Sequence, residues 1–97
     1  MPAYLIARVH VHDPDTYANY TALSPAIIKA HGGRFLARSQ APITLEGPAD
    51  TRRTVVVEFP DVPQAQAFYE SAQYQAAKAI REPASEAEFI IVPGFEG

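Results

Sequence analysis

The stretch RTVVVEFPDVPQ, residues 53–64, combines a strand that alternates between two faces with the first residues of a helix. One face of the strand is apolar and carries Val55, Val57 and Phe59. The other face is mixed and carries Thr54, Val56 and Glu58. Asp61 and Gln64 stand three residues apart, which is typical of a capped helix N-terminus. We therefore predict a strand over 53–59 that is covered on one side and leads directly into a helix.

The N-terminal segment predicts a second strand of the same kind. Residues 3–12 alternate between a wholly apolar face and a mixed face. The apolar face carries Ala3, Leu5, Ala7, Val9 and Val11, and the mixed face carries Tyr4, Ile6, Arg8, His10 and His12. Shorter strands are predicted over 34–39 and 88–92. The connection over 40–51 is long for a hairpin, so it is either an extension of the strands or a functional loop.

Two helical regions lie between these strands. Asp13 and Pro14 begin the first, Ser24-Pro25 interrupts it and Gly32-Gly33 ends it. Its apolar residues at helical spacing are Tyr17, Tyr20, Leu23 and Ile27. The second region begins at Asp61, breaks near Ser71 and ends before Pro83. Its predicted buried stripe consists of Val62, Ala65, Phe68, Tyr69 and Ala72, followed by Tyr74, Ala77 and Ile80.

The resulting order, β-α-β-β-α-β, predicts an α+β fold of the ferredoxin-like type. In this sandwich the helices cover one face of a four-stranded antiparallel sheet, and residues 1–97 form a single domain. The other face would carry Arg8, His10, His12 and Glu58 among Tyr4, Ile6 and Val56. An open face with that much apolar surface predicts association. We therefore expect a homodimer that packs through its sheets.

Composition and charge exclude several classes of protein. The net charge of -3 and the absence of a Lys/Arg cluster argue against a nucleic-acid-binding protein. No apolar run is long enough to cross a membrane and no signal peptide is recognisable, so we expect a cytoplasmic protein. Six of the eight cations are arginine, which indicates buried or interfacial ion pairs or reflects codon usage.

Several motifs, spread over nearly the whole chain, resemble one family. They are Asp13-Pro14-Asp15 with Tyr17 and Tyr20, the segment 31–38 (HGGRFLAR), Leu45-Glu46-Gly47, the segment 55–60 (VVVEFP), and Phe68-Tyr69 with Ser71 and Tyr74-Gln75. Together these motifs resemble the bacterial family of domain of unknown function 1330. That family is similar to the dimeric α/β-barrel proteins, in which two ferredoxin-like protomers pack their sheets together.

The resemblance implies a fold and a dimer but no reaction. Related dimeric α/β-barrel proteins include cofactor-free monooxygenases of polyketide quinones, muconolactone isomerases and haem-dependent chlorite-decomposing enzymes. Because chemistry varies on one scaffold, the site must be argued from its residues. No residue of this chain stands in a recognisable haem-ligand motif, and we expect no cofactor.

The predicted open face offers candidates for acid–base chemistry. His10 and Glu58 are the candidate bases, with Arg8 beside them to hold an anion. The alternative is that Arg8 and Glu58 form a structural ion pair, within one protomer or across the dimer. His10 and His12 point the same way and could hold a metal, but a third ligand is lacking, so we predict no metal site.

Two further groups are candidates for ligand binding. Arg34 and Arg38 are predicted to emerge on one face of their strand, where they could hold a carboxylate or phosphate, or pair with Glu46 or Glu58. Tyr69, Tyr74 and Arg81 surround the break in the second helical region. They are predicted to line the mouth of a pocket, with Tyr17 and Tyr20 opposite, unless the tyrosines are simply core residues.

These candidates support two hypotheses of different classes. In the first, the dimer binds a small organic acid or aromatic metabolite in a cleft, and any enzymatic reaction is cofactor-free and relies on the reactivity of the substrate. In the second, the protein is a non-catalytic ligand-sensing or stress-related dimer module.

Overall fold

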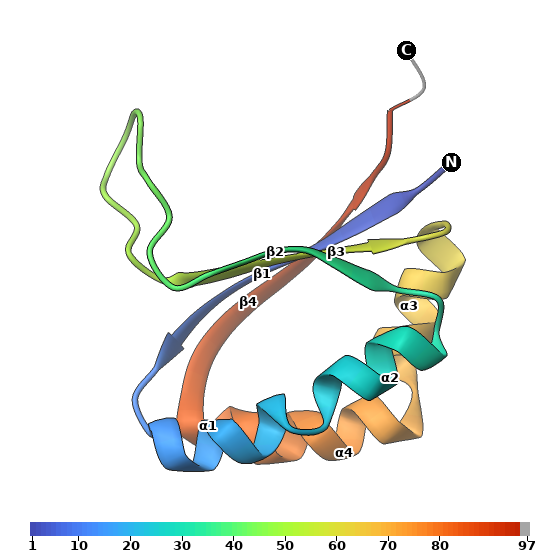
Figure 1. Ribbon diagram of the computed structural model, residues 1–97, viewed down its shortest axis with the longest axis horizontal. Coiled ribbons are helices and arrows are strands. Elements are labelled where there is room, and N and C mark those ends of the chain that lie inside the picture. Colours follow the sequence, from blue (N-terminus) through green and yellow to red (C-terminus); the bar gives the residue numbers. More distant parts are fainter. Residues whose placement is uncertain (96–97) are drawn as a thin grey trace.

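The computed structural model describes residues 1–95 and shows one antiparallel sheet with all helices on one face (Figure 1). The four strands have the order β2-β3-β1-β4. Their bounds are β1 (Ala3–Val11), β2 (Arg34–Ser39), β3 (Arg53–Phe59) and β4 (Ser85–Pro93). The α+β ferredoxin-like fold predicted from the sequence is confirmed.

The helices form two broken pairs. The first pair is α1 (Pro14–Thr21) and α2 (Ser24–Ala30), and the second is α3 (Val62–Glu70) and α4 (Ala72–Arg81), followed by the 3-10 turn η1 (Glu82–Ala84). Side chains cap three of the four helices: Asp13 accepts from the amide of Thr16, Asp61 from that of Gln64 and Ser71 from that of Tyr74. Gly32, at φ 79°, ends the first pair in the left-handed conformation that glycine adopts without strain.

The core lies between the sheet and the helices. The apolar face of the central strand β1 is fully covered, and Val57 and Phe59 of β3 lie beside it at 1% and 0% exposure. Phe59 packs against Phe68 of α3, and Phe68 packs against Tyr74 of α4, with ring centroids 5.3 Å and 4.6 Å apart. The break at Ser71 therefore lets both segments of the second pair place an aromatic ring against the sheet, Phe68 against Phe59 of β3 and Tyr74 against Phe89 of β4.

A bulge in β2 changes the face on which one predicted site residue lies. Arg34 is paired with Glu58 and Phe35 with Val57, but the next pair is Ala37 with Val56, so Leu36 is extra. The bulge reverses the alternation beyond it. Arg34 therefore lies on the open face and Arg38, paired with Val55, on the face toward the helices. The prediction that both guanidinium groups emerge on one face is wrong.

Other differences from the prediction are smaller. Ala72 is exposed because the chain is extended at Ser71 and begins a new helix there. Leu23 lies in the break between α1 and α2 and is 45% exposed. Strand β4 begins at Ser85, three residues before the predicted start, because its first residues pair with the end of β1.

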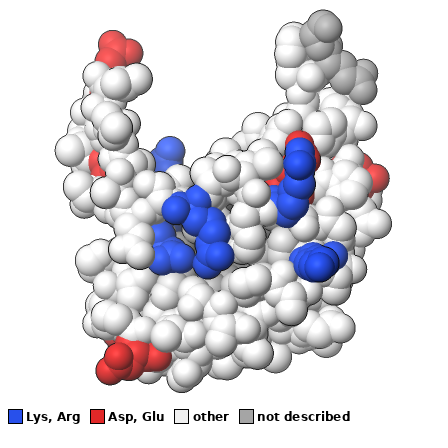
Figure 2. All heavy atoms as spheres, in the orientation of Figure 1, with Lys and Arg blue, Asp and Glu red and all other residues white. Residues whose placement is uncertain are grey.

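Two projections flank the open face of the sheet. The first, which we call the arm, is the β2–β3 connection over residues 40–52 (Figure 1). The second, which we call the tail, consists of residues 94–95 after β4. In the space-filling view the open face forms a trough between them (Figure 2). Ile43 and Leu45 of the arm and Phe95 of the tail are 87%, 91% and 92% exposed. Among the described residues, no helix has the length and apolar character needed to span a membrane.

The cap of α3 gives a direct test of the fold. Asp61→Ala removes the 2.9 Å bond to the amide of Gln64 and should lower the free energy of unfolding by about 1 kcal/mol. Asp61→Asn can still accept this bond and should lose much less. Urea denaturation followed by circular dichroism measures both. As a control, Asp15→Ala, at a surface position in α1, should stay within about 0.5 kcal/mol of the wild type. An equal loss in all three variants would contradict the capping role.

Candidate functional site

The six arginines of the chain divide between the two faces of the sheet. Three are paired with carboxylates on the open-face side: Arg8 with Asp50 at 3.9 Å, Arg34 with Glu58 at 2.8 Å, and Arg52 with Asp50 at 2.7 Å. Arg52 also contacts Glu88. These pairs lie at the surface, where water screens the charges, so each contributes little to stability.

The other three arginines lie on the helix side of the sheet, where Arg81 is buried, Arg53 is half-buried and Arg38 is exposed. Within residues 1–95, Arg38, Arg53 and Arg81 form no ion pair. Arg53 and Arg81 each have a buried Nε without a hydrogen-bond partner. Instead, their guanidinium groups lie against aromatic rings. The guanidinium carbon of Arg38 is 4.4 Å from the ring centroid of Phe35, that of Arg53 is 5.7 Å from Tyr17, and that of Arg81 is 4.6 Å from Phe89.

Tyrosines supply most of the other polar atoms of this interior. The hydroxyls of Tyr20 and Tyr74 are 2.9 Å apart in a buried hydrogen bond. Burial raises the pKa of Tyr20, and its interaction with Tyr74 raises that pKa further. Burial also raises the pKa of Tyr74, although the charge of Arg81 acts in the opposite direction. Burial likewise raises the pKa of Tyr17, and the charge of Arg53 opposes it. All three hydroxyls therefore stay protonated at neutral pH and can donate hydrogen bonds.

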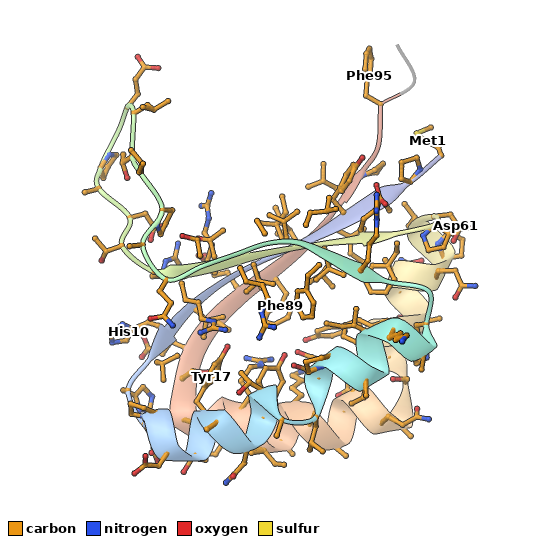
Figure 3. All side chains as sticks on the ribbon, in the orientation of Figure 1. Met1, His10, Tyr17, Asp61, Phe89 and Phe95 are labelled. Carbon is orange, nitrogen blue, oxygen red and sulfur yellow. The ribbon has the colours of Figure 1, made fainter. Side chains whose placement is uncertain are left out.

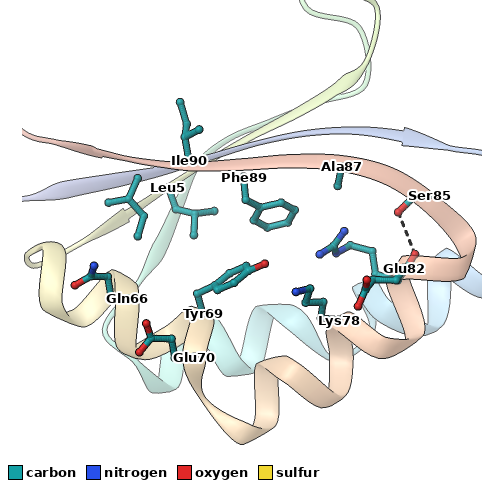
Figure 4. Close-up of a pocket in the computed structure, with 12 residues that line it drawn as sticks. Leu5, Gln66, Tyr69, Glu70, Lys78, Glu82, Ser85, Ala87, Phe89 and Ile90 are labelled. Atoms are coloured by element: carbon teal, nitrogen blue, oxygen red, sulfur yellow. Dashed lines mark hydrogen bonds between the residues drawn. The ribbon is translucent and has the colours of Figure 1, made fainter.

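Two clefts open into this interior from different sides. The larger, about 620 Å³, lies between β4 and the helices α3 and α4, and we call it the α4 cleft (Figure 4). The smaller, about 470 Å³, lies beside α1 at the end of β1, and we call it the α1 cleft. A narrow cavity of about 40 Å³ lies between the two clefts. It shares Leu5 and Phe89 with the α4 cleft. It shares Val9, Tyr17 and Arg53 with the α1 cleft. Tyr17 and Phe89 point into this space (Figure 3).

The candidate bases do not come together. Glu58 is opposite Tyr4 in the sheet, and His10 is six residues further along β1, which is about 20 Å at ordinary strand spacing. Glu58 is bound to Arg34, and Arg8 to Asp50, so the expected pair of Arg8 and Glu58 is absent within the described protomer. His10 lines the α1 cleft.

No metal site is assembled in the part of the chain that the structure describes. The rings of His10 and His12 have centroids 6.5 Å apart. No group of three or more His, Cys, Asp or Glu side chains comes together within residues 1–95.

The predicted group at the helix break is brought together. Tyr69 and Arg81 line the α4 cleft, and Tyr74 lies beneath them with 0% exposure, so it is a core residue whose hydroxyl reaches the interior. Sequence reasoning did not single out Arg53, Lys78 or Phe89. Arg53 had a signal, because it shares the alternation of Val55 and Val57, which predicts the covered face.

The hydroxyl pair can be tested without a ligand. Tyr20→Phe and Tyr74→Phe each leave one buried hydroxyl unpaired and should lower the free energy of unfolding by about 1–3 kcal/mol. The double variant removes both hydroxyls and should cost less than the sum of the two single changes. Urea unfolding of all three proteins measures the difference, with Tyr4→Phe on the open face as a control. Strictly additive losses would show that the two hydroxyls do not interact.

Three solved structures are similar to this one in fold. A protein of unknown function from Rhodopseudomonas palustris is 19% identical, with a TM-score of 0.76 over 99% of this chain and 84% of that chain. SnoaB, a cofactor-independent oxygenase from Streptomyces nogalater, is 12% identical, with a TM-score of 0.71 over 99% and 95%. A dimeric ferredoxin-like protein of unknown function from Thermobifida fusca is 18% identical, with a TM-score of 0.68 over 97% and 92%.

The sequence itself also has a match. The family described as domain of unknown function (DUF1330) matches residues 2–95. No curated protein matches the chain.

Proposed function

Because the chain belongs to the DUF1330 family and folds like proteins that include a cofactor-independent oxygenase, we propose that it binds a small organic acid or aromatic metabolite between its sheet and helices. One observation supports this function above the others. Among the described residues, the buried Arg81 and the half-buried Arg53 face the interior without a carboxylate partner, whereas the three arginines on the open-face side are paired.

An unpaired buried charge is costly. Removing a guanidinium group from water has an effective cost of several kcal/mol, which a nearby anion offsets. Arg81 is 5% exposed and its Nε has no partner. The contacts with Phe89 and Tyr20 offset part of this cost, since cation–π contacts contribute about 1–2 kcal/mol when desolvated. The anionic group of a ligand would supply the missing partner.

The walls of the interior favour a ligand with an aromatic ring. Tyr69 lies between Tyr74 and Phe89, with ring centroids 5.3 Å and 6.0 Å away. Flat apolar walls with a few polar groups are typical of sites for small metabolites, and the volume of the α4 cleft lies in the usual range of about 300–1,000 Å³.

The same groups limit the chemistry that the interior can perform. Protonated tyrosine hydroxyls and arginines stabilise negative charge, so they would favour the enolate or phenolate form of a bound ligand. Neither group removes a proton at neutral pH. His10, on the rim of the α1 cleft, remains the base candidate, and Glu58 is engaged with Arg34. A reaction here would depend on the reactivity of the substrate, as expected for a cofactor-free enzyme. A ligand-sensing module would use the same groups without turnover.

The open face supports the proposal that the protein is a homodimer. Ile6, Val56 and Ile90 lie side by side on neighbouring strands of this face, and Ile90 is 56% exposed. A contiguous exposed apolar surface of this kind marks an interface. The exposed Ile43, Leu45 and Phe95 on the two projections would extend the contact around a second copy. The cytoplasmic location expected from the sequence stays a prediction.

Ligand binding can be tested by thermal shift. Carboxylates, quinones and haem are added at millimolar concentration to the full chain. At least one aromatic acid should raise the midpoint of unfolding by about 5 °C or more, because a ligand that binds only the folded state stabilises it. The matching neutral alcohol is the control and should give a smaller rise. The absence of a shift with every compound would contradict the proposal.

The dimer can be tested by sedimentation at micromolar concentration. The wild type should sediment as a dimer, and Ile6→Arg should sediment as a folded monomer because it places a charge at the centre of the open face. Leu23→Arg is a matched control, since Leu23 is 45% exposed in the break between α1 and α2, and it should stay dimeric. A wild-type monomer would contradict the proposed interface.

A further inference from the structure

Arg81 is held in a fixed position at the end of α4. It is the last residue of that helix, and its carbonyl accepts a 3.1 Å hydrogen bond from the Ser85 hydroxyl. The carbonyl of Ala84, in the turn η1 that follows, accepts the amides of His12 and Asp13 at 3.1 Å each. The backbone over residues 81–84 is thus tied to β4 and to the end of β1. The helix end that carries Arg81 is therefore anchored to the sheet.

Aromatic rings and a second cation surround Arg81 in the α4 cleft. Its guanidinium carbon lies 4.6 Å from the ring centroid of Phe89, and Phe89 lies 6.0 Å from Tyr69. Lys78, one helical turn before Arg81, places its ammonium nitrogen 5.2 Å from the Tyr69 ring. Figure 4 shows Tyr69 and Phe89 facing each other across the cleft, with Lys78 beside them. A flat ring packed against this aromatic pair would bring a substituent to the two cations.

The carboxylates of the cleft do not neutralise Arg81. Glu70 and Glu82 line the cleft, but both are exposed and neither forms an ion pair with Arg81 or Lys78 within the described residues. Water screens an exposed carboxylate far more than it screens a group that is 5% exposed. The nearby Tyr69 side chain raises the pKa of Lys78, so this second cation stays charged at neutral pH. The inner end of the cleft is therefore positive and its rim is negative.

The position of Arg81 also selects the kind of anion. The last turn of a helix carries partial negative charge, which disfavours a doubly charged group such as phosphate. Within residues 1–95, no glycine-rich loop or helix N-terminus lines the cleft, and these are the usual partners of phosphate. A singly charged carboxylate on an aromatic ring gains both the charge of Arg81 and the contact with Tyr69 and Phe89.

We infer that the α4 cleft is a site for a flat aromatic carboxylic acid, with its carboxylate on Arg81 and Lys78 and its ring packed against the rings of Tyr69 and Phe89. This rests on the proposed function and specifies its ligand class and orientation. The negative rim of Glu70 and Glu82 orients the acid, because it repels the carboxylate from the mouth and leaves the inner cations as its only favourable place.

The test is calorimetric titration of the full chain with 2-naphthoate as the probe. The comparison compounds are 2-naphthalenemethanol, 2-naphthyl phosphate and octanoate. The naphthoate should bind more tightly than all three. Arg81→Met keeps the length of the side chain and removes its charge, so it should weaken naphthoate binding by about tenfold or more and leave the alcohol within about twofold. Arg34→Met, on the open face, is the matched control and should change neither affinity.

A folding readout accompanies the titration. Without ligand, Arg81→Met should unfold at the same temperature as the wild type or higher, because it removes an unpaired buried charge. If it does not fold, Arg81→Gln takes its place. Equal naphthoate affinity in the wild type and the Arg81 variant would overturn the subsite while leaving the proposed function standing. A loss in Arg53→Met without a loss in the Arg81 variant would place the acid at the α1 cleft and overturn it too. If no aromatic acid, naphthoate included, binds the wild type, both proposals fail.

Discussion

The sorting of side chains between the two faces of the sheet decides which charges of this protein are buried and which remain in water. On the open-face side, Arg8, Arg34 and Arg52 find carboxylates. On the helix side, Arg53 of β3 and Arg81 of α4 form no ion pair within the described residues. The interior is therefore an aromatic space whose buried Arg81 has no carboxylate partner among residues 1–95. Its affinity for an anion follows from that imbalance.

The broken helices make this interior possible. In a continuous helix over 62–81, the direction of the buried face at the end would follow from its direction at the start. The chain is instead extended at Ser71 and begins a new helix there, so the buried face of α4 is oriented independently of that of α3. As a result, Phe68 and Tyr74 both reach the sheet, and Arg81 at the end of α4 reaches Phe89 of β4. The interruption at Ser24 likewise lets α1 bring Tyr17 and Tyr20 to one end of the interior and α2 bring Ile28 to the other.

The fold could be predicted from the sequence because its signals are local. Alternation in β1 and β3, the caps at Asp13 and Asp61, and the stop at Gly32 each depend on a few neighbouring residues. The face of the sheet on which Arg38 lies could not be predicted from the sequence. The bulge at Leu36 arises from the pairing of β2 with β3, and no pattern in the sequence of β2 indicates it. The distance between His10 and Glu58 also could not be predicted, because it depends on the register between β1 and β3, which places Tyr4 opposite Glu58.

The candidate site was only partly predictable for a related reason. Tyr69, Tyr74 and Arg81 lie close together in sequence, so the helix break was enough to group them. Phe89 joins Arg81 from β4, and Arg53 of β3 meets Tyr17 of α1, and only the packing of the helices on the sheet reveals these contacts. The absence of a carboxylate partner for Arg81 is likewise a property of the three-dimensional surroundings within the described residues.

The most direct test of this account observes the arginine side chains themselves. In a ¹⁵N-labelled protein, the six Nε–H resonances can be followed by nuclear magnetic resonance during titration with 2-naphthoate. We expect the Arg81 resonance to shift most and those of Arg38 and Arg53 to shift less. The resonances of the paired Arg8, Arg34 and Arg52 should stay in place. Shifts confined to the paired arginines of the open face, with no change at Arg81, would contradict it.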